Sequence, residues 1–167
     1  MPSTQKTIVF DAAKCFGCHA CSVACMDQND IDIQRDGVML RRVADVEQMQ
    51  AGEVRIAHVS LACMHCADAG CIDACPSRAL TRDFATGAVV VRRELCIGCR
   101  ACAMACPFGV PRFGAEGTLM KCDGCFARTR FGERPACVDI CPGGALTYED
   151  INKVMDCKER KYGASLM

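Results

Sequence analysis

The chain has 167 residues, of which 17 are cysteine and none is tryptophan, and its 20 basic and 20 acidic side chains give a formal net charge of zero. A neutral chain has no general attraction to nucleic acid or to an anionic membrane, and no apolar run is long enough to span a bilayer. Aromatic residues make up only 5 % of the chain, so cysteine and alanine supply much of its apolar content. Such a core is thin, and the composition predicts inorganic groups at its centre.

The first segment is typical of a short strand, a cysteine-rich loop and a short helix. We expect the strand over Thr7–Phe10 and the helix over Ala20–Met26. The loop and the helix carry motif one, spaced C-x2-C-x2-C-x3-C: Cys15, Cys18, Cys21 and Cys25.

Residues 27–57 contain no cysteine and begin with an acidic, loop-like stretch. Val38–Val46 is then strand-like, and Glu53–Val59 alternates towards the next motif. We interpret 27–57 as an insertion, either a covering hairpin or a surface for a partner, and not as a separate domain.

Motifs two and three follow each other closely. A strand is expected at Leu80–Thr81 after motif two and another at Ala88–Val91 before motif three, which leads into a helix over Ala101–Ala105. Motif two is spaced C-x2-C-x4-C-x3-C-P and consists of Cys63, Cys66, Cys71 and Cys75. Motif three has the spacing C-x2-C-x2-C-x3-C-P and consists of Cys96, Cys99, Cys102 and Cys106.

Motif four is spaced C-x2-C-x11-C-x3-C-P and precedes a strand expected at Leu146–Tyr148. A C-terminal helix is expected to carry Ile151, Val154 and Met155 on its apolar face, with Cys157 beside them as an unligated thiol. The cysteines of motif four are Cys122, Cys125, Cys137 and Cys141.

Disulfides, zinc and iron–sulfur clusters are the three chemistries that need so many cysteines. The N-terminal residues show neither a signal-peptide pattern nor a twin-arginine pattern, which predicts a cytoplasmic protein whose thiols stay reduced; export together with a signal-bearing partner is the open alternative. Zinc ribbons supply separated pairs of ligands around one ion, whereas three cysteines within seven residues suit three corners of a four-iron cube. Four such motifs in one chain therefore predict iron–sulfur clusters.

Glycines and prolines beside the cysteines agree with this interpretation. Gly17 and Gly98 lie inside the first C-x2-C of their motifs, where a positive φ lets the backbone approach a cluster. Proline follows the fourth cysteine of three motifs and is expected there at the first position of a helix. Met26 takes the place of this proline in motif one, so the backbone that follows Cys25 is expected to take a different course.

The three histidines are weighed separately. Cys15, Cys18 and His19 match the C-x-x-C-H pattern of haem attachment, but haem would leave two cysteines of motif one without a role. His65 is expected to donate a hydrogen bond near a cluster and not to be a ligand. His58 belongs to no motif and is expected at a strand edge or on the surface.

The fold class predicted from this repeat is α+β, with two nested ferredoxin-like units. Motifs two and three are close in sequence, and motifs one and four stand at the two ends. The inner unit is expected over residues 58–109, inserted into an outer unit made of 1–57 and 110–167.

The four motifs in this order resemble those of four-cluster iron–sulfur subunits of the DMSO-reductase type. Three stretches carry the resemblance, which covers nearly the whole chain: residues 11–15, 106–113 and 121–142. Gly124 and Gly143 depart from it, because many relatives carry larger residues there.

The resemblance implies a non-catalytic subunit with four [4Fe–4S] clusters that relays electrons to or from a larger molybdenum- or tungsten-pterin oxidoreductase. The short chain is similar to the small subunits of tungsten aldehyde oxidoreductases, which favours that partner. A flavin, NAD or ferredoxin protein is expected as the second redox partner, with which the subunit exchanges electrons. Self-association of the subunit stays open. The alternative is a free polyferredoxin or hydrogenase-linked carrier.

Two-cluster ferredoxins cross their ligands, so that the fourth cysteine of each motif binds the cluster of the paired motif. By the same wiring we expect motif one to pair with four and motif two with three. This gives site A (Cys15, Cys18, Cys21, Cys141), site B (Cys25, Cys122, Cys125, Cys137), site C (Cys63, Cys66, Cys71, Cys106) and site D (Cys75, Cys96, Cys99, Cys102).

Overall fold

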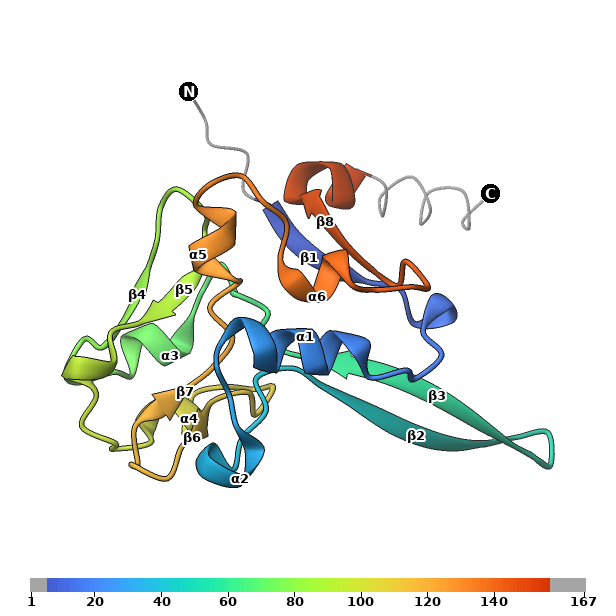
Figure 1. The fold of residues 1–167 in the computed structure, drawn as a ribbon, viewed down its shortest axis with the longest axis horizontal. Coiled ribbons are helices and arrows are strands. Elements are labelled where there is room, and N and C mark those ends of the chain that lie inside the picture. Colours follow the sequence, from blue (N-terminus) through green and yellow to red (C-terminus); the bar gives the residue numbers. More distant parts are fainter. Residues whose placement is uncertain (1–5, 157–167) are drawn as a thin grey trace.

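The structure is a computed structural model that describes residues 6–156. Short helices alternate with four separate two-stranded antiparallel sheets (Figure 1). The strands are β1 (Lys6–Phe10), β2 (Arg42–Gln50), β3 (Glu53–Leu61), β4 (Leu80–Arg82), β5 (Val89–Val91), β6 (Arg112–Phe113), β7 (Leu119–Met120) and β8 (Leu146–Asp150). The helical segments are η1 (Ala12–Lys14), α1 (Ala20–Gln28), α2 (Ile33–Asp36), α3 (Gly70–Asp73), η2 (Arg93–Leu95), α4 (Ala101–Met104), α5 (Phe126–Thr129) and α6 (Ala136–Asp139).

The first and last described strands, β1 and β8, pair with each other. Phe10 lies opposite Leu146, and the Asp11 N–H extends the ladder by donating to the Ala145 carbonyl at 2.8 Å. Beneath this sheet α1 packs against α6, and a core forms from Cys21, Cys137, Val138 and Leu146 (Figure 1). Motif one is thereby brought against motif four.

Strands β4 and β5 join motif two to motif three in the same way. Leu80 lies opposite Val91, and both strands contribute to a core that includes Val89 and Leu119. Helices α3 and α4, which carry later cysteines of these two motifs, pack together beside this sheet. The expected strands next to the motifs are therefore present, each longer or shorter by one or two residues.

The insertion contributes to a hairpin of two nine-residue strands, β2 and β3, and the first of these strands begins later than expected. Val38 and Leu40 are buried in a core with Cys25 and Cys122, so the chain enters β2 only at Arg42. Near its base the hairpin covers the cysteine loop of motif one. Its distal half projects from the molecule and is exposed on both faces (Figure 1).

The prolines do not begin helices, contrary to the expectation. In motifs two, three and four the helix ends before the fourth cysteine, and Pro76, Pro107 and Pro142 each open a short turn. A turn suits proline equally well because its φ is already fixed. Motif one does differ as expected, because α1 continues through Cys25 to Gln28.

The C-terminal part of the predictions is described only partly. Residues 151–156 are helical, as expected, whereas Cys157 lies outside the described residues. No helix among residues 6–156 combines the length and the apolar character that crossing a membrane requires.

Truncating Leu80 to alanine is expected to lower the free energy of unfolding by about 3 kcal/mol, because this side chain is 1 % exposed and its loss leaves a cavity. The change is measured by circular dichroism during denaturant unfolding. Phe84→Ala is the matched control, since Phe84 is 87 % exposed and its truncation should cost less than about 0.5 kcal/mol. Equal losses for the two variants would contradict this description of the core.

Candidate iron–sulfur centres

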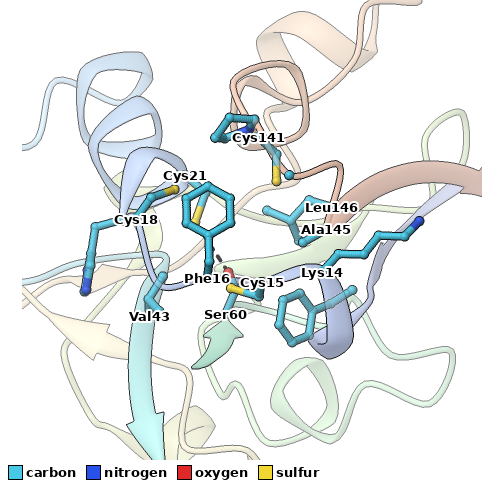
Figure 2. A pocket seen from close by; sticks show the side chains of 14 residues that line it. Lys14, Cys15, Phe16, Cys18, Cys21, Val43, Ser60, Cys141, Ala145 and Leu146 are labelled. Atoms are coloured by element: carbon cyan, nitrogen blue, oxygen red, sulfur yellow. Dashed lines mark hydrogen bonds between the residues drawn. The ribbon is translucent and has the colours of Figure 1, made fainter. Parts of the chain in front are cut away.

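The four cysteines of site A line one pocket (Figure 2). Cys15, Cys18 and Cys21 come from motif one, and Cys141 reaches the pocket from the end of motif four. The walls are otherwise mainly apolar and come from β1, the base of the β2–β3 hairpin and β8. At one wall the Ser60 hydroxyl lies 3.6 Å from the Cys21 sulfur.

The four cysteines of site B are all buried. Burial raises the pKa of the Cys25 thiol, and negative charge on Cys122, Cys125 and Cys137 raises it further. These side chains come from α1 and motif four, so the structure brings together residues that are distant in sequence. Four buried thiols can release their protons together only if positive charge compensates for them.

Three members of each remaining site are also brought together. Burial raises the pKa of Cys71, and charge on Cys63 and Cys106 of site C adds to the effect. Burial likewise raises the pKa of Cys102 to about 11, with contributions from Cys71, Cys75 and Cys96. These couplings do not involve Cys66, which is half-buried, or Cys99, which is exposed.

Neighbouring sites are close enough for their thiols to interact. After burial and Arg41, the next influence on the pKa of Cys137 in site B is the charge of Cys21 in site A. Burial raises the pKa of Cys122 in site B to about 11, and Cys63 of site C contributes. Charge on Cys71 of site C likewise raises the pKa of Cys102 in site D, so electrostatic effects link site A with B, B with C and C with D.

Two buried cations lie among these thiols. Arg41 is 4 % exposed; burial opposes its charge, but negative charge on the thiols around it, led by Cys137, raises its pKa above the usual value. One guanidinium nitrogen, Nη1, donates to Ser60 at 2.9 Å, while Nε has no partner. Lys121 is 5 % exposed, and its ammonium group contacts two backbone carbonyls and, at 3.8 Å, the Cys63 sulfur.

Neither buried cation forms an ion pair with a carboxylate within residues 6–156. A buried charge without a counter-charge is strongly unfavourable, so these cations require negative charge nearby. Four-thiolate iron–sulfur clusters would supply that charge at the cysteines that Arg41 and Lys121 already approach. The residues present therefore fit such clusters.

Backbone amides also point at the cysteine sulfurs. The N–H groups of His65, Leu119 and Gly124 lie 3.5, 3.4 and 3.4 Å from the sulfurs of Cys63, Cys96 and Cys122, respectively. Amides in this position stabilise negative charge on a ligating thiolate. The glycines expected to have a positive φ do have one, +73° at Gly17 and +68° at Gly98.

His65 contacts a cysteine of another motif. Its Nδ1 accepts a hydrogen bond from the Val89 N–H at 2.9 Å, and its Nε2 lies 3.7 Å from the Cys122 sulfur. Burial, followed by the charge of Lys121, lowers the pKa of His65 to about 3, which keeps the ring neutral. The expected hydrogen-bond role is present, but it is directed to motif four.

The prediction for His58 was incomplete. The residue is on β3, but its ring bonds Asp45 at 2.7 Å and lies against the cysteine loop of motif one at Gly17. Arg41 and Ser60 were missed altogether, because neither belongs to a motif and their positions depend on how the hairpin folds back. Lys121 stands next to Cys122, and that adjacency was the one available signal.

The two glycines that depart from the resemblance each have a spatial role. A Cβ on Gly143 would lie 2.8 Å from the Lys14 carbonyl, so glycine allows motif four to approach motif one. Gly124 has a φ of +74°, which directs its N–H to the Cys122 sulfur.

Comparison with known proteins shows which family the chain belongs to. Residues 54–151 match the family model described as a 4Fe-4S dicluster domain. One subunit of the anaerobic dimethyl sulfoxide reductase of Haemophilus influenzae is 37 % identical over 169 residues, covering 95 % of this chain and 78 % of the relative. The chain belongs to this family of iron–sulfur subunits.

Two relatives from Escherichia coli K12 extend the comparison. The corresponding subunit of its anaerobic dimethyl sulfoxide reductase is 37 % identical, covering 91 % of this chain and 77 % of the relative. The iron–sulfur subunit of its nitrate-inducible formate dehydrogenase is 34 % identical, covering 92 % of this chain and 57 % of the relative. The iron–sulfur subunit described here is an electron-transfer chain with [4Fe–4S] clusters and not a catalytic chain.

No group of three or more His, Cys, Asp or Glu side chains within 6–156 is arranged to hold a single metal ion. The sixteen cysteines in this range are free of disulfides.

Gly17→Ala is expected to reduce the iron content of the subunit, because the new Cβ would lie 2.5 Å from Nδ1 of His58 and displace the cysteine loop. Iron per chain is measured after anaerobic purification.

Gly37→Ala is the control for backbone strain. Gly37 also has a positive φ, +66°, but no atom lies within 4 Å of the added carbon. The second variant, Gly17→Ala with His58→Ala, removes the clash and should restore part of the iron. Equal iron in Gly17→Ala and Gly37→Ala would show that the contact with His58 is unimportant.

Proposed function

We propose that this subunit carries four [4Fe–4S] clusters, one at each of sites A to D, and relays single electrons between the metal centre of a larger catalytic subunit and a second redox protein. The observation that carries the proposal is the grouping of the cysteines: a pocket lined by all of site A, and a buried set that contains all of site B. Each of these groups joins three cysteines of one motif to a single cysteine of another.

The crossed ligation and the nested ferredoxin-like units are parts of the same proposal. The pairing of β1 with β8 supports an outer unit built from motifs one and four, and the pairing of β4 with β5 supports an inner unit from motifs two and three. Electrostatic effects between thiols of successive sites support a single row. Such a row offers one electron path from site A to site D.

The catalytic partner is proposed to be of the DMSO-reductase type. Relatives of this chain are named as subunits of dimethyl sulfoxide reductase and formate dehydrogenase, which favours a molybdenum-pterin partner over a tungsten aldehyde oxidoreductase. The alternatives are a hydrogenase-linked electron carrier and a free polyferredoxin, and the second of these would need no fixed partner.

Reconstituted protein is expected to bind about sixteen iron atoms per chain, four at each site. Cys141→Ser should alter the cluster that Cys15 helps to hold and leave the cluster at Cys122 unchanged, although Cys141 and Cys122 share a motif. Iron analysis and electron paramagnetic resonance of the reduced protein measure both effects.

Cys157→Ser is the matched control, because Cys157 is the one cysteine outside the four motifs and its loss should leave the iron content unchanged. Saturation near eight iron atoms, or an effect of Cys141→Ser confined to the cluster at Cys122, would overturn the proposed ligation.

The subunit is expected to co-purify from its native source with a larger chain that contains molybdenum. Size-exclusion chromatography followed by metal analysis tests this directly. Elution of the subunit alone, fully loaded with iron, would favour the free polyferredoxin. Tungsten in the larger chain would identify the other class of partner.

A further inference from the structure

Two side chains cross between motif two and motif four. His65, which lies between Cys63 and Cys66 in motif two, directs Nε2 to the Cys122 sulfur of motif four at 3.7 Å. Lys121, next to Cys122 in motif four, directs its ammonium group to the Cys63 sulfur of motif two at 3.8 Å. Each motif thus sends a hydrogen-bond donor to a thiol of the other.

One residue of β5 orients both donors. The Val89 N–H donates to Nδ1 of His65, so the neutral ring carries its proton on Nε2, facing Cys122. The Val89 carbonyl accepts from the ammonium group of Lys121. Val89 is 1 % exposed, and β5 is fixed by its pairing with β4. The two donors are therefore held by rigid backbone.

The crossing lies where the two proposed units meet. Cys122 belongs to site B of the outer unit and Cys63 to site C of the inner unit. The Lys121 ammonium group also donates to the Cys122 carbonyl at 2.7 Å, so a single positive charge contacts backbone from both units. Electrons that pass along the row must cross at this place.

We propose that His65 and Lys121 are positioning residues that raise the reduction potentials of the two middle clusters, each acting on the cluster of the other unit. The proposal rests on the ligation given above. Reduction adds one negative charge to a cluster and moves no proton at these residues, so a donor or a cation at a ligating sulfur favours the reduced state. His65 acts on the cluster at site B, and Lys121 acts on the cluster at site C.

The test is a redox titration of the holoprotein followed by electron paramagnetic resonance. His65→Leu is expected to decrease the reduction equilibrium constant of the site B cluster about tenfold, a shift of about 59 mV to lower potential for a one-electron couple. Lys121→Met should shift the site C cluster in the same direction by at least as much. Cys25→Ser and Cys106→Ser assign the signals of sites B and C.

Two further variants separate this role from a structural one. His65→Gln retains a side-chain N–H donor and should recover part of the shift at site B. Lys14→Met is the matched control: Lys14 also precedes the first cysteine of a motif, but it is exposed and pairs with Asp11 at 3.8 Å. It should leave the potentials of sites B and C unchanged.

The outcomes distinguish this proposal from the ligation on which it rests. Full iron content with unchanged potentials in His65→Leu and Lys121→Met would overturn the crossing alone. A shift in which His65 affects only site C and Lys121 only site B would also overturn it, since each residue would then act within its own motif. Fewer than four clusters in the unaltered protein would instead overturn the ligation.

Discussion

Negative charge in a thin interior is the constraint on which the structure depends. Sixteen thiols must lose their protons to bind iron, yet burial raises the pKa of several of them, most strongly at site B. Arg41 and Lys121 oppose that cost from inside, where water does not screen their charge, and neither is neutralised by a carboxylate in the described part of the chain. Bound clusters and these two buried cations would therefore balance each other's charge inside the same core.

The cysteine loops also contain backbone conformations that are unusual for residues other than glycine. His19 and Arg100 occupy equivalent places in motifs one and three, with φ of 59° and 64°, each just before a helix that carries the third cysteine. A left-handed conformation is unfavourable for residues other than glycine, and it persists where the surroundings determine it. The loops have to curve around their contents, and the same curvature recurs wherever the same spacing does.

The sequence was informative where chemistry depends on spacing. The motifs, the strands beside them and the positive φ of Gly17 were predicted from neighbouring residues alone. The turns that begin at the prolines after the fourth cysteines were not predicted, because proline suits the start of a turn and the start of a helix equally. The roles of Arg41 and His58 and the contact between His65 and Cys122 could not be predicted, since the partners of these side chains are decided by how distant segments pack. The ligand sets and nested units stay predictions until iron is bound and located.

The pairing of β1 with β8 also affects how the protein is made. Strand β1 leaves the ribosome well before its partner β8, because nearly all of the described residues lie between the two strands. Strands β4 and β5, by contrast, are separated by a short connection and can pair as soon as both have left the ribosome. The segment between β1 and β8 can therefore begin to fold while the cysteines of motif one still lack their neighbours from motif four. The proposed sites A and B therefore cannot be completed until motif four has also been synthesised.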